Sequence, residues 1–568
     1  MDTISKEIKM INKIKNLIKN NNLDGYILPK NDKYFTEYSK LNNLQLASNF
    51  SGSAGFAVIL KKKNYLFVDG RYTIQAKKES GNKFKIFEIP YKWPKDIFKD
   101  LKIGFDPKLF TQNILYRYFE NKCNLIAINQ KLFDKNSKLK KDKPFYTLKD
   151  EVSGERSNLK INRAIKYLKK KKLNYLYISA GENICWLLNI RGNDLPNSPV
   201  ANCKLILTEK RKIYFFSPNF KVSNIKSKFK KIKIDFFKES DFFEVLTSLN
   251  FGKFCIDNQT CSIFDEELIK SKFKIDHRID PIYYFKSIKN KTEIENMKKA
   301  HIDDGVALSK FLYWIKNTNI KKITEKKVES KLESFRKLNK NYLFPSFDTI
   351  AGSGPNGAII HYRSDENSNR KLKNNDLLLV DSGGQYRWGT TDVTRTICFS
   401  KPSNKIKNIF TRVLKGHIAV AISNIIKEKT GHNIDKRARK SLNSVGLDYR
   451  HGTGHGVGYF LNVHEGPQSL SKNNKVELKE GMIVSNEPGF YLEKNFGIRI
   501  ENLVFIKKIS KKLKFENLTL APIDKHLINF KMLNKTEKDY LFSYHLNVYE
   551  KISKYLNKKE KKWLINFL

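Results

Sequence analysis

The segment HGTGHGVGYFLNVHEGP, residues 451–467, places three histidines and five glycines within 17 positions. The whole chain has 10 histidines, and none comes before His277. Histidine is the only side chain whose unperturbed pKa lets it change charge near neutral pH, and it is also the commonest metal ligand. We therefore expect the chemistry of the protein in its C-terminal half.

Two aspartates lie eleven residues apart on either side of a glycine-rich turn. Asp381 ends the apolar run LLLV, and Asp392 precedes the β-prone run VTRTICF. In a β-hairpin such a spacing can bring two strand residues face to face. Two adjacent carboxylates repel each other unless they share a proton or a cation. The spacing therefore predicts an acidic pair that holds a proton or a metal.

A second acidic pair has the same arrangement. Glu487 follows GMIVSN, Glu501 lies in GIRIEN fourteen residues later, and His455 stands between the two pairs along the chain. Four carboxylates and one imidazole form a set that is rich in oxygen donors. This set suits two hard or borderline divalent cations, with manganese (Mn²⁺) first and cobalt or zinc as alternatives.

Each of these residues also has an ordinary structural explanation. An aspartate before glycine at the end of a strand commonly forms a turn, and a single histidine among glycines is usually a surface or core residue. GIRIEN can be an alternating strand with Arg499 and Glu501 paired on one face. For each residue taken alone, both explanations stay open.

These polar residues lie in a stretch of short β-prone runs. From about residue 345 the runs TIAGSG, LLLVDSGG, VTRTICF, GMIVSNEPGF and GIRIENLVFI follow one another, and one helical span, about residues 404–427, interrupts them. A long helix is expected before them, where Thr292 and Glu295 have the spacing of a capping box. The pattern predicts an antiparallel sheet with helices as the frame of the site.

The N-terminal half contains two similar α/β segments. In the first, a lysine-rich amphipathic helix precedes the runs GYIL, GFAVIL, YLFVDG and KIGFDP. In the second, INRAIKYLKKKK precedes LNYLYIS, KLILTE, KIYFFSP and KFCIDN, at an offset of about 150 residues. The repeated order predicts an internal duplication, with two α/β domains joined near residues 144–157. Two unrelated α/β domains are the alternative.

The bulk composition restricts the class of protein. The chain has 568 residues, 40% hydrophobic content and a net charge of +50, and this length predicts two to four domains. No apolar run reaches the roughly 18 residues of a membrane span, and the N-terminus resembles a first helix without a signal core, so we expect a cytoplasmic protein without a membrane partner. The six cysteines lack CxxC spacing and are expected to be reduced and buried. The lysines are spread from end to end, so no specific nucleic-acid partner is expected.

Three motifs contain the acidic pairs and the central histidine: DSGGQYRWGTTDVTRT, HGTGHGVGYFLNVHEGP and EPGFY…GIRIEN. In this order they resemble the motifs of the pita-bread metallopeptidases, and within them the long, three-domain form of the aminopeptidase P (Xaa-Pro aminopeptidase) family. AGSGPNGAIIHYR, WLLNIRGNDLPNSPV and NFSGSAGFAVIL are similar to further segments from all three domains. The resemblance covers almost the whole chain.

The resemblance implies an α/β (α+β) fold with four parts. Two creatinase-like α/β domains are expected over residues 1–150 and 151–289, a pita-bread catalytic domain over residues 290–509, and a helical C-terminal extension over residues 510–568. The resemblance also implies that this extension takes part in the contacts of a homodimer. Tyr459 and Asn486 depart slightly from the family pattern, but neither position is a ligand.

By position, the resemblance implies a site for two divalent metal ions. Asp381 and Asp392 ligate one metal, and Asp392 also reaches the other. His455 completes the ligands of the second metal. Glu487 and Glu501 supply the remaining carboxylate contacts, and Glu501 bridges the two metals.

The implied activity is removal of the first residue from a peptide whose second residue is proline. A hydroxide that bridges the metals attacks the first carbonyl, and Glu487 takes the proton from the bridging water. His361, His451 and His464 match the family's non-ligand histidines around the substrate. Of these, His361 stabilises the oxyanion, and His464 hydrogen-bonds the reacting peptide group or protonates the leaving prolyl nitrogen. An Xaa-Pro bond lacks the amide N–H on which ordinary aminopeptidases depend.

Arg499 stands two residues before Glu501 and therefore on the same strand face. It is expected to orient a ligand carboxylate such as Asp392. A plain ion pair within the sheet is the alternative.

Several other functions compete with this one. A prolidase would demand a dipeptide with a free carboxylate, and a methionine aminopeptidase would lack the two N-terminal domains. A catalytically inactive pita-bread domain that binds histone, RNA or protein partners would lack ligands, whereas all five positions are filled here. A nucleic-acid-binding protein would cluster arginine with aromatic residues and bind with a steep salt dependence.

Overall fold

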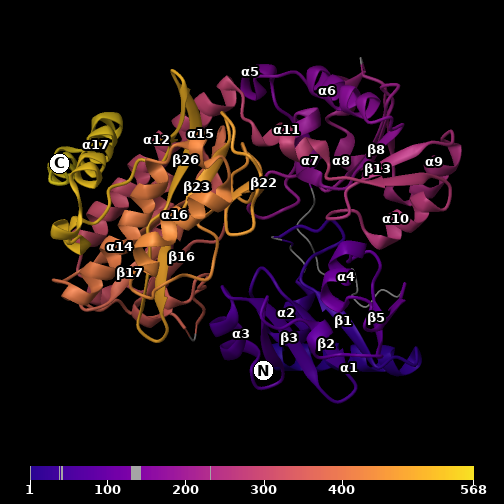
Figure 1. Ribbon diagram of the computed structural model, residues 1–568, viewed down its shortest axis with the longest axis horizontal. Helices are drawn as coiled ribbons and strands as arrows, with labels where there is room; N and C mark the ends of the chain where they lie inside the picture. The colour runs from indigo at the N-terminus through magenta and orange to yellow at the C-terminus, as the bar shows by residue number, and fades with distance from the viewer. Residues whose placement is uncertain (1, 38, 40–41, 130–142, 231, 367) are drawn as a thin grey trace. The chain divides into compact units, whose positions relative to one another are not determined.

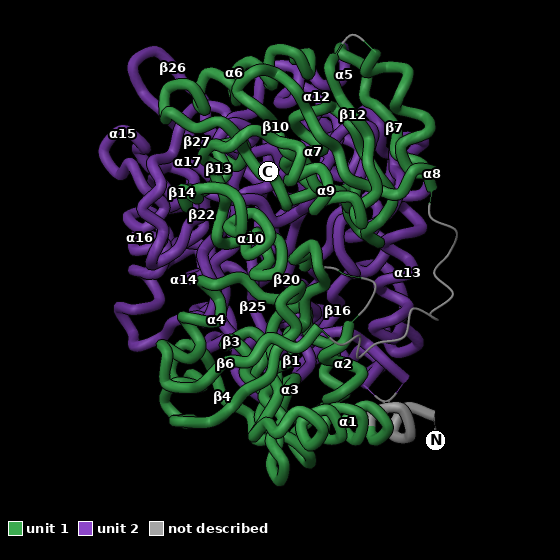
Figure 2. Tube along the Cα trace, turned by 90° about the vertical axis from the view of Figure 1, so that its right-hand side faces the viewer, with its two compact units in different colours: residues 1–150, 155–283 green, residues 151–154, 284–568 purple. Residues whose placement is uncertain are grey.

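The computed structural model describes residues 2–37, 39, 42–129, 143–230, 232–366 and 368–568. The chain divides into two compact units (Figure 1, Figure 2). Unit 1 contains residues 1–150 and 155–283, and unit 2 contains residues 151–154 and 284–568. Both units mix helices and strands, which confirms the expected α/β (α+β) class.

Unit 1 is built on two six-stranded sheets. The first consists of β1 (Gly25–Pro29), β2 (Phe56–Leu60), β3 (Asn64–Asp69), β4 (Lys85–Ile89), β5 (Lys102–Phe105) and β6 (Asn124–Ala127). The second consists of β8 (Tyr175–Ile178), β10 (Lys204–Thr208), β11 (Ile213–Phe216), β12 (Ile234–Phe237), β13 (Lys253–Ile256) and β14 (Lys274–His277). All eight strands that the repeated runs predict are present.

The two sheets have the same topology. Their strand orders are β4-β3-β2-β1-β5-β6 and β12-β11-β10-β8-β13-β14. In each sheet the central strand pairs antiparallel with one neighbour and parallel with the other, as β1 does with β2 and β5 and as β8 does with β10 and β13. The repeated topology is the one that an internal duplication predicts.

Helices cover both faces of the first sheet. The helix α1 (Asp2–Asn20) buries Ile14 and Ile18 against one face, which includes Leu28 of β1. The next residue toward the N-terminus, Ile27, points to the opposite face, where α4 (Gln112–Phe119) packs through Leu115. Successive strand residues point to opposite faces, so the continuous apolar run GYIL marks a strand that is buried on both sides.

Unit 2 contains the long helix α12 (Lys291–Asn317), as its sequence predicts. The capping box that starts it is formed by Asn290 and Glu293, not by Thr292 and Glu295. The Asn290 side chain accepts a hydrogen bond from the backbone N–H of Glu293 at 3.0 Å, so the helix starts two residues earlier than expected. Both pairs have the required spacing, and the prediction selected the wrong one.

Two antiparallel sheets form the frame of unit 2, which confirms the predicted pattern. One has the order β16-β17-β20, with β16 (Ile350–Ser353), β17 (Leu377–Ser382) and β20 (Val393–Cys398). The other has the order β22-β21-β23-β26-β27, with β21 (Gly454–Gly456), β22 (Glu465–Leu470), β23 (Ile483–Asn486), β26 (Asn502–Ile509) and β27 (Lys512–Asn517). Unit 2 also contains a three-stranded sheet of order β15-β18-β19, with β15 (Tyr342–Pro345), β18 (Gly384–Tyr386) and β19 (Gly389–Thr390). The strands β24 (Gly489–Leu492) and β25 (Phe496–Arg499) form an antiparallel pair.

Three helices, where one was expected, follow β20 in the chain. The predicted span 404–427 is interrupted, since α14 covers Asn404–Ala421 and the short α15 covers Ile425–Glu428. The third helix, α16 (Gly431–Asn443), was not predicted, although it buries Ile434, Ala438 and Leu442 at a spacing of four residues. This spacing is the apolar stripe of an amphipathic helix, and the charged residues between these positions obscure it.

The C-terminal residues form the helices α17 (Lys535–Ile552) and α18 (Lys558–Ile565), as their periodicity predicts. Leu541, Tyr544 and Val548 of α17 are buried in one core with Phe410 of α14. All six cysteines are buried and free. Among the described residues, no helix is both long enough and apolar enough to cross a membrane.

Candidate metal centre

The first acidic pair lies on one hairpin, in a register that differs from the expected one. Strand β17 pairs antiparallel with β20, and the partner of Asp381 is Thr394. Asp392 precedes Val393, the first residue of β20, which pairs with Ser382. Asp381 and Asp392 are therefore diagonal neighbours on one face, because positions two residues apart on a strand share a face. They share a face of the hairpin, but they are not directly opposed as the spacing predicted.

The second acidic pair is directly opposed. Strand β23 pairs with β26 so that Asn486 faces Asn502, and β24 pairs with β25 so that Gly489 faces Arg499. Both pairings belong to one continuous register, and within it Glu487 falls opposite Glu501. The next opposed pair in this register is Pro488 and Ile500, and the backbone N–H of Ile500 donates to the carbonyl of Pro488 at 3.3 Å. Residues that face each other across antiparallel strands have adjacent side chains.

His455 is the central residue of β21, between Gly454 and Gly456. A Cβ atom at Gly454 would lie 1.9 Å from the carbonyl oxygen of Ser485, and one at Gly456 would lie 2.3 Å from that of Glu465. Only glycine fits at such close approaches of backbone. The glycines therefore let β21 insert between its neighbours, as the sequence predicts.

The imidazole of His455 points its Nε2 atom at the carboxylates. Nε2 lies 3.4 Å from Asp392 Oδ2 and 3.6 Å from Glu487 Oε1. Nδ1 donates a hydrogen bond to the backbone carbonyl of Gly456 at 2.9 Å. A histidine whose Nδ1–H is held by a carbonyl presents Nε2 as its ligand atom, which is the usual arrangement at metal sites.

The donor atoms around His455 fit a metal ion. One potential ligand atom from each of Asp392, His455 and Glu501 lies within 4.8 Å of the other two. Asp381 Oδ1 is buried, and among the described residues it has no hydrogen-bond partner. A buried carboxylate oxygen without a partner is costly, and a cation would satisfy it.

The electrostatics of the cluster also favour a bound cation. Burial, together with the negative charges of Asp381 and Glu487, raises the pKa of Asp392 to about 6, against the opposing effect of His455. Burial, together with the negative charges of Asp392, Glu487 and Asp381, raises the pKa of Glu501 well above its ordinary value. Burial alone would lower the pKa of His455, but Asp392 and Glu487 raise it to about 9. The raised pKa values mean that protons bind to the cluster more readily than usual. A divalent cation would stabilise the same negative charges.

Arg499 pairs with Asp381, not with Asp392 as expected. Its Nη2 donates to Asp381 Oδ2 at 2.7 Å, and both side chains are buried. Its Nε donates to Thr394 Oγ1 at 3.0 Å, and Thr394 in turn donates to Glu501 Oε2 at 2.7 Å. The register of β17 and β20 brings Asp381 and Thr394 together, so one guanidinium reaches both. Sequence reasoning missed Thr394 because threonine is common in strands.

His451 is connected to the same network through Tyr491. Arg499 Nη1 donates to the Tyr491 hydroxyl at 2.7 Å, and that hydroxyl lies 2.9 Å from His451 Nε2. Since the tyrosine oxygen accepts from Arg499, its own O–H donates to His451. Tyr491 was also missed, although it belongs to the motif EPGFY and lies two residues from Gly489, which faces Arg499.

His464 and His361 are the other two histidines that were expected at the substrate, and His464 lies beside His455. The ring of His464 lies 4.3 Å from that of His455 between centroids, at an interplanar angle of 83°. The next residue, Glu465, is buried and accepts from the ammonium groups of Lys286 (3.1 Å) and Lys289. His361 is half-buried in the turn after η5 (Gly354–Ala358), which packs against β16, β17, β24 and β25. The structure thus gathers Asp381, Asp392, His455, Glu487 and Glu501 with His451, His464 and Arg499.

Comparisons with known proteins agree with this architecture. Residues 295–508 match the model of metallopeptidase family M24, and residues 511–566 match the model of its C-terminal region. Residues 10–132 and 136–293 match models of the creatinase/prolidase N-terminal domain. Xaa-Pro aminopeptidase 1 of Dictyostelium discoideum is 35% identical over 602 residues, which cover 99% of this chain and 95% of that protein. The chain belongs to metallopeptidase family M24.

Solved structures separate two kinds of M24 relative. The X-prolyl aminopeptidase of Caenorhabditis elegans, a cytosolic enzyme with a di-nuclear active site, has a TM-score of 0.91 and 28% identity, and the match covers 99% of each chain. The prolidase of Pyrococcus horikoshii has a TM-score of 0.53 and 27% identity. That match covers 99% of the prolidase but only 65% of the present chain. The full-length architecture is therefore that of the first structure.

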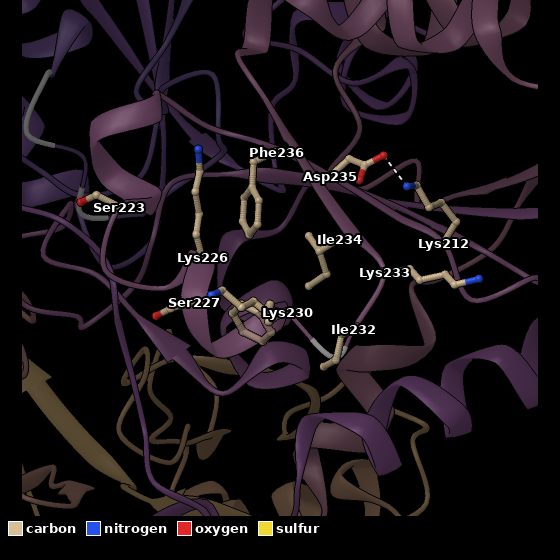
Figure 3. A pocket seen from close by; sticks show the side chains of 11 residues that line it. Lys212, Ser223, Lys226, Ser227, Lys230, Ile232, Lys233, Ile234, Asp235 and Phe236 are labelled. Atoms are coloured by element: carbon tan, nitrogen blue, oxygen red, sulfur yellow. Dashed lines mark ion pairs between the residues drawn. The ribbon is translucent and has the colours of Figure 1, made fainter.

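A second concentration of charge lies in unit 1, beside the edge strand β12 (Figure 3). This lysine depression has a volume of about 910 Å³ and is lined by Lys212, Lys226, Lys230 and Lys233. Lys212 pairs with Asp235, and the other three lysines are exposed. The ammonium groups of Lys226 and Lys233 point in different directions (Figure 3). They do not converge on one point, so the depression lacks the geometry of a binding site.

Proposed function

We propose that the chain is a dinuclear metal-dependent aminopeptidase that hydrolyses the N-terminal Xaa-Pro bond of peptides and releases the residue before proline. One observation carries the proposal: Asp392, His455 and Glu501 offer ligand atoms within 4.8 Å of one another, with Glu487 beside His455, in unit 2 of a chain that matches Xaa-Pro aminopeptidases over its full length. The observation also opposes an inactive binding domain, which would lack ligands.

The proposed ligands are Asp381, Asp392, His455, Glu487 and Glu501. When bound, two divalent cations would supply a bridging hydroxide as the nucleophile and would polarise the first carbonyl of the substrate. Manganese is proposed because carboxylate oxygens dominate the donor set, with cobalt and zinc as alternatives. Arg499 holds Asp381 through its 2.7 Å hydrogen bond and so orients a ligand.

The remaining side chains act on the substrate and its protons. Glu487 takes the proton from the attacking water, and the hydroxyl of Ser485 holds one of its carboxylate oxygens at 3.0 Å. His361 stabilises the developing oxyanion, and His464 hydrogen-bonds the reacting peptide group or protonates the leaving prolyl nitrogen. His451 contacts the substrate and is oriented by the Tyr491 hydroxyl.

The preference for proline has a chemical reason. Proline lacks the backbone N–H, so an enzyme that needs this donor rejects an Xaa-Pro bond. A site that binds the carbonyl oxygen with its own positive charges and hydrogen-bond donors does not need this backbone N–H. The full-length match to the Caenorhabditis elegans structure favours an aminopeptidase over a prolidase.

Four further properties belong to the proposal. The protein is cytoplasmic, which its six free, buried cysteines support. It forms a homodimer through the C-terminal helices, where Phe542 and Tyr555 are exposed. It needs neither a membrane nor a specific nucleic acid. Its parts are residues 1–150, 151–289, 290–509 and 510–568.

The test uses metal-depleted protein that is reloaded separately with manganese, cobalt or zinc. It is incubated with Arg-Pro-Pro, Ala-Pro and Ala-Ala-Ala, alongside His455→Ala and the control His432→Ala, which changes an exposed histidine. We expect metal-dependent release of arginine from Arg-Pro-Pro that is lost only in His455→Ala. Cleavage of Ala-Pro alone would indicate a prolidase, and no cleavage with any metal would indicate a binding domain.

A further inference from the structure

The buried carboxylate of Glu325 has no assigned role in the site. Glu325 is the first residue of α13 (Glu325–Arg336), and its exposed fraction is 0%. Among the described residues it forms no ion pair. Burial raises its pKa, against the opposing effect of its hydrogen bonds. A buried carboxyl group without a cation is costly unless its oxygens are fully hydrogen-bonded. The hydrogen-bond donors to Glu325 therefore indicate its role.

Four residues donate hydrogen bonds to this one carboxylate. Oε1 accepts from the backbone N–H of Ser353 at 2.7 Å and from Asn356 Nδ2 at 3.1 Å. Oε2 accepts from the Tyr362 hydroxyl at 2.7 Å and from the backbone N–H of Arg370 at 2.9 Å. Asn356 Nδ2 also lies 3.0 Å from Oε2.

Three of the four donors belong to one short stretch of chain. We call residues 353–362 the His361 segment, since His361 is its next-to-last residue. Ser353 begins the segment, Asn356 lies within η5, and Tyr362 ends it directly after His361. One carboxylate therefore holds both ends and the middle of the segment that carries His361.

The same segment is packed against the strands of the metal centre. A Cβ atom at Gly497 of β25 would lie 1.7 Å from the carbonyl oxygen of Gly357, so the two backbones are in direct contact. The Tyr362 ring is buried with Ile350 of β16 and Leu379 of β17. Ile350 pairs with Asp381 in the sheet. A shift of the segment would therefore change the place of His361 relative to Asp381.

We propose that Glu325 is a positioning residue of the reaction: it anchors the His361 segment and so fixes His361 against the oxyanion that develops in the transition state. The inference rests on the proposed function and deepens it. Only a carboxylate offers two acceptor oxygens to N–H and O–H donors on both sides. A glutamine in its place would turn an N–H group toward one set of donors. Preorganised donors contribute to the rate only when they are held in place.

The experiment compares Glu325→Gln and Tyr362→Phe with the native enzyme and with Glu333→Gln. Glu333 lies on the same helix and pairs with Lys337 at the surface, so its variant controls for loss of a carboxylate from α13. For Glu325→Gln we expect kcat on Arg-Pro-Pro to fall roughly 10- to 100-fold. KM and the number of bound metal ions stay unchanged. Tyr362→Phe keeps the ring and loses one anchor, so its kcat falls less, and Glu333→Gln matches the native enzyme.

A second background shows whether the effect passes through His361. In His361→Ala protein, Glu325→Gln should change kcat by less than about twofold, since residues that act as a unit are not additive. If Glu325→Gln lowers kcat by the same factor in the His361→Ala protein as in the native protein, the proposal is overturned and Glu325 has a general structural role. An unchanged kcat in Glu325→Gln would also overturn it. If Glu325→Gln does not fold, the kcat of Tyr362→Phe in the native and the His361→Ala proteins shows instead whether the effect passes through His361.

A readout without catalysis keeps this inference separate from the proposed function. Backbone amide hydrogen exchange over residues 353–362 should be faster in Glu325→Gln than in the native protein and unchanged in Glu333→Gln. If the native protein releases no arginine with any metal, the proposed function fails while the anchor stands. If arginine is released and exchange in the segment does not change, the anchor fails while the function stands.

Discussion

The metal centre of unit 2 and the lysine depression of unit 1 both gather side chains of one charge, but they differ in burial. Asp381, Asp392 and Glu501 are 8%, 4% and 2% exposed, whereas Lys226 and Lys230 are exposed. Each carboxylate stands on or beside a strand whose partner is fixed by register. The lysines lie on short helical turns and at an edge strand.

The difference shows what makes a cluster of charges a site. Exposed like charges are screened by water and salt and turn away from one another. Buried like charges remain close only where the backbone holds them and a counter-charge is supplied. The carboxylates are therefore under electrostatic stress without a cation, and the lysines are not. Substitutions in the metal centre should therefore change activity far more than substitutions in the lysine depression.

Asp392→Asn should abolish the activity. Asp392 lies 3.4 Å from His455 Nε2 and is the proposed ligand of both metals, so its loss should cost at least about a thousandfold in kcat/KM on Arg-Pro-Pro. Metal content, measured after dialysis, should fall with it. A variant that keeps both metals and more than a tenth of the activity would contradict the assigned role.

Arg499→Lys should weaken the enzyme by an intermediate amount. A lysine ammonium cannot contact Asp381, Thr394 and Tyr491 at once, as the guanidinium does. We expect metal affinity or kcat/KM to fall roughly 10- to 100-fold. Arg437→Lys, at a surface pair with Glu428, serves as the control. If the two variants behave alike, Arg499 is only an ion pair within the sheet.

The metal-depleted protein should become less stable as the pH rises. The folded-state pKa of Asp392 is raised to about 6, so folding binds a proton and the stabilisation present at low pH is lost as the pH rises through 6. The pKa of His455 is raised to about 9, so its contribution is present below about 6.5 and is lost as the pH rises through 9. Thermal unfolding of the native and Asp392→Asn proteins between pH 5 and 9, each without metal, measures the difference. Equal slopes for the two proteins would contradict this account.

Changes in the lysine depression should have the smallest effect. Replacing Lys226, Lys230 and Lys233 by alanine removes three exposed charges that make no converging contacts. We expect kcat/KM to change by less than about twofold and the melting temperature by less than about 2 °C, as is usual for surface substitutions. A tenfold loss of activity would mean that exposed charge does contribute to function here and would remove the contrast.

Local sequence patterns predicted much of this molecule. Eight strands of unit 1 follow from short apolar runs between turns, and the two six-stranded sheets have the topology that their repetition predicts. The spacing of each acidic pair was compatible with a hairpin, and the resemblance of the three motifs to the pita-bread metallopeptidases implied one site for Asp381, Asp392, His455, Glu487 and Glu501. Strand formation and turn chemistry depend on neighbours in the chain, so the sequence by itself determined them.

Only the tertiary structure decided which side chains pair. Arg499 contacts Asp381 across 118 residues of sequence, and Glu325 contacts Arg370 and Tyr362 across 45 and 37 residues. The motif of Arg499 was compatible with either aspartate, and nothing in the sequence distinguishes Glu325 from the other glutamates of its helix. Such partners depend on strand register and on how the sheets pack, because both set which buried donor meets which buried acceptor.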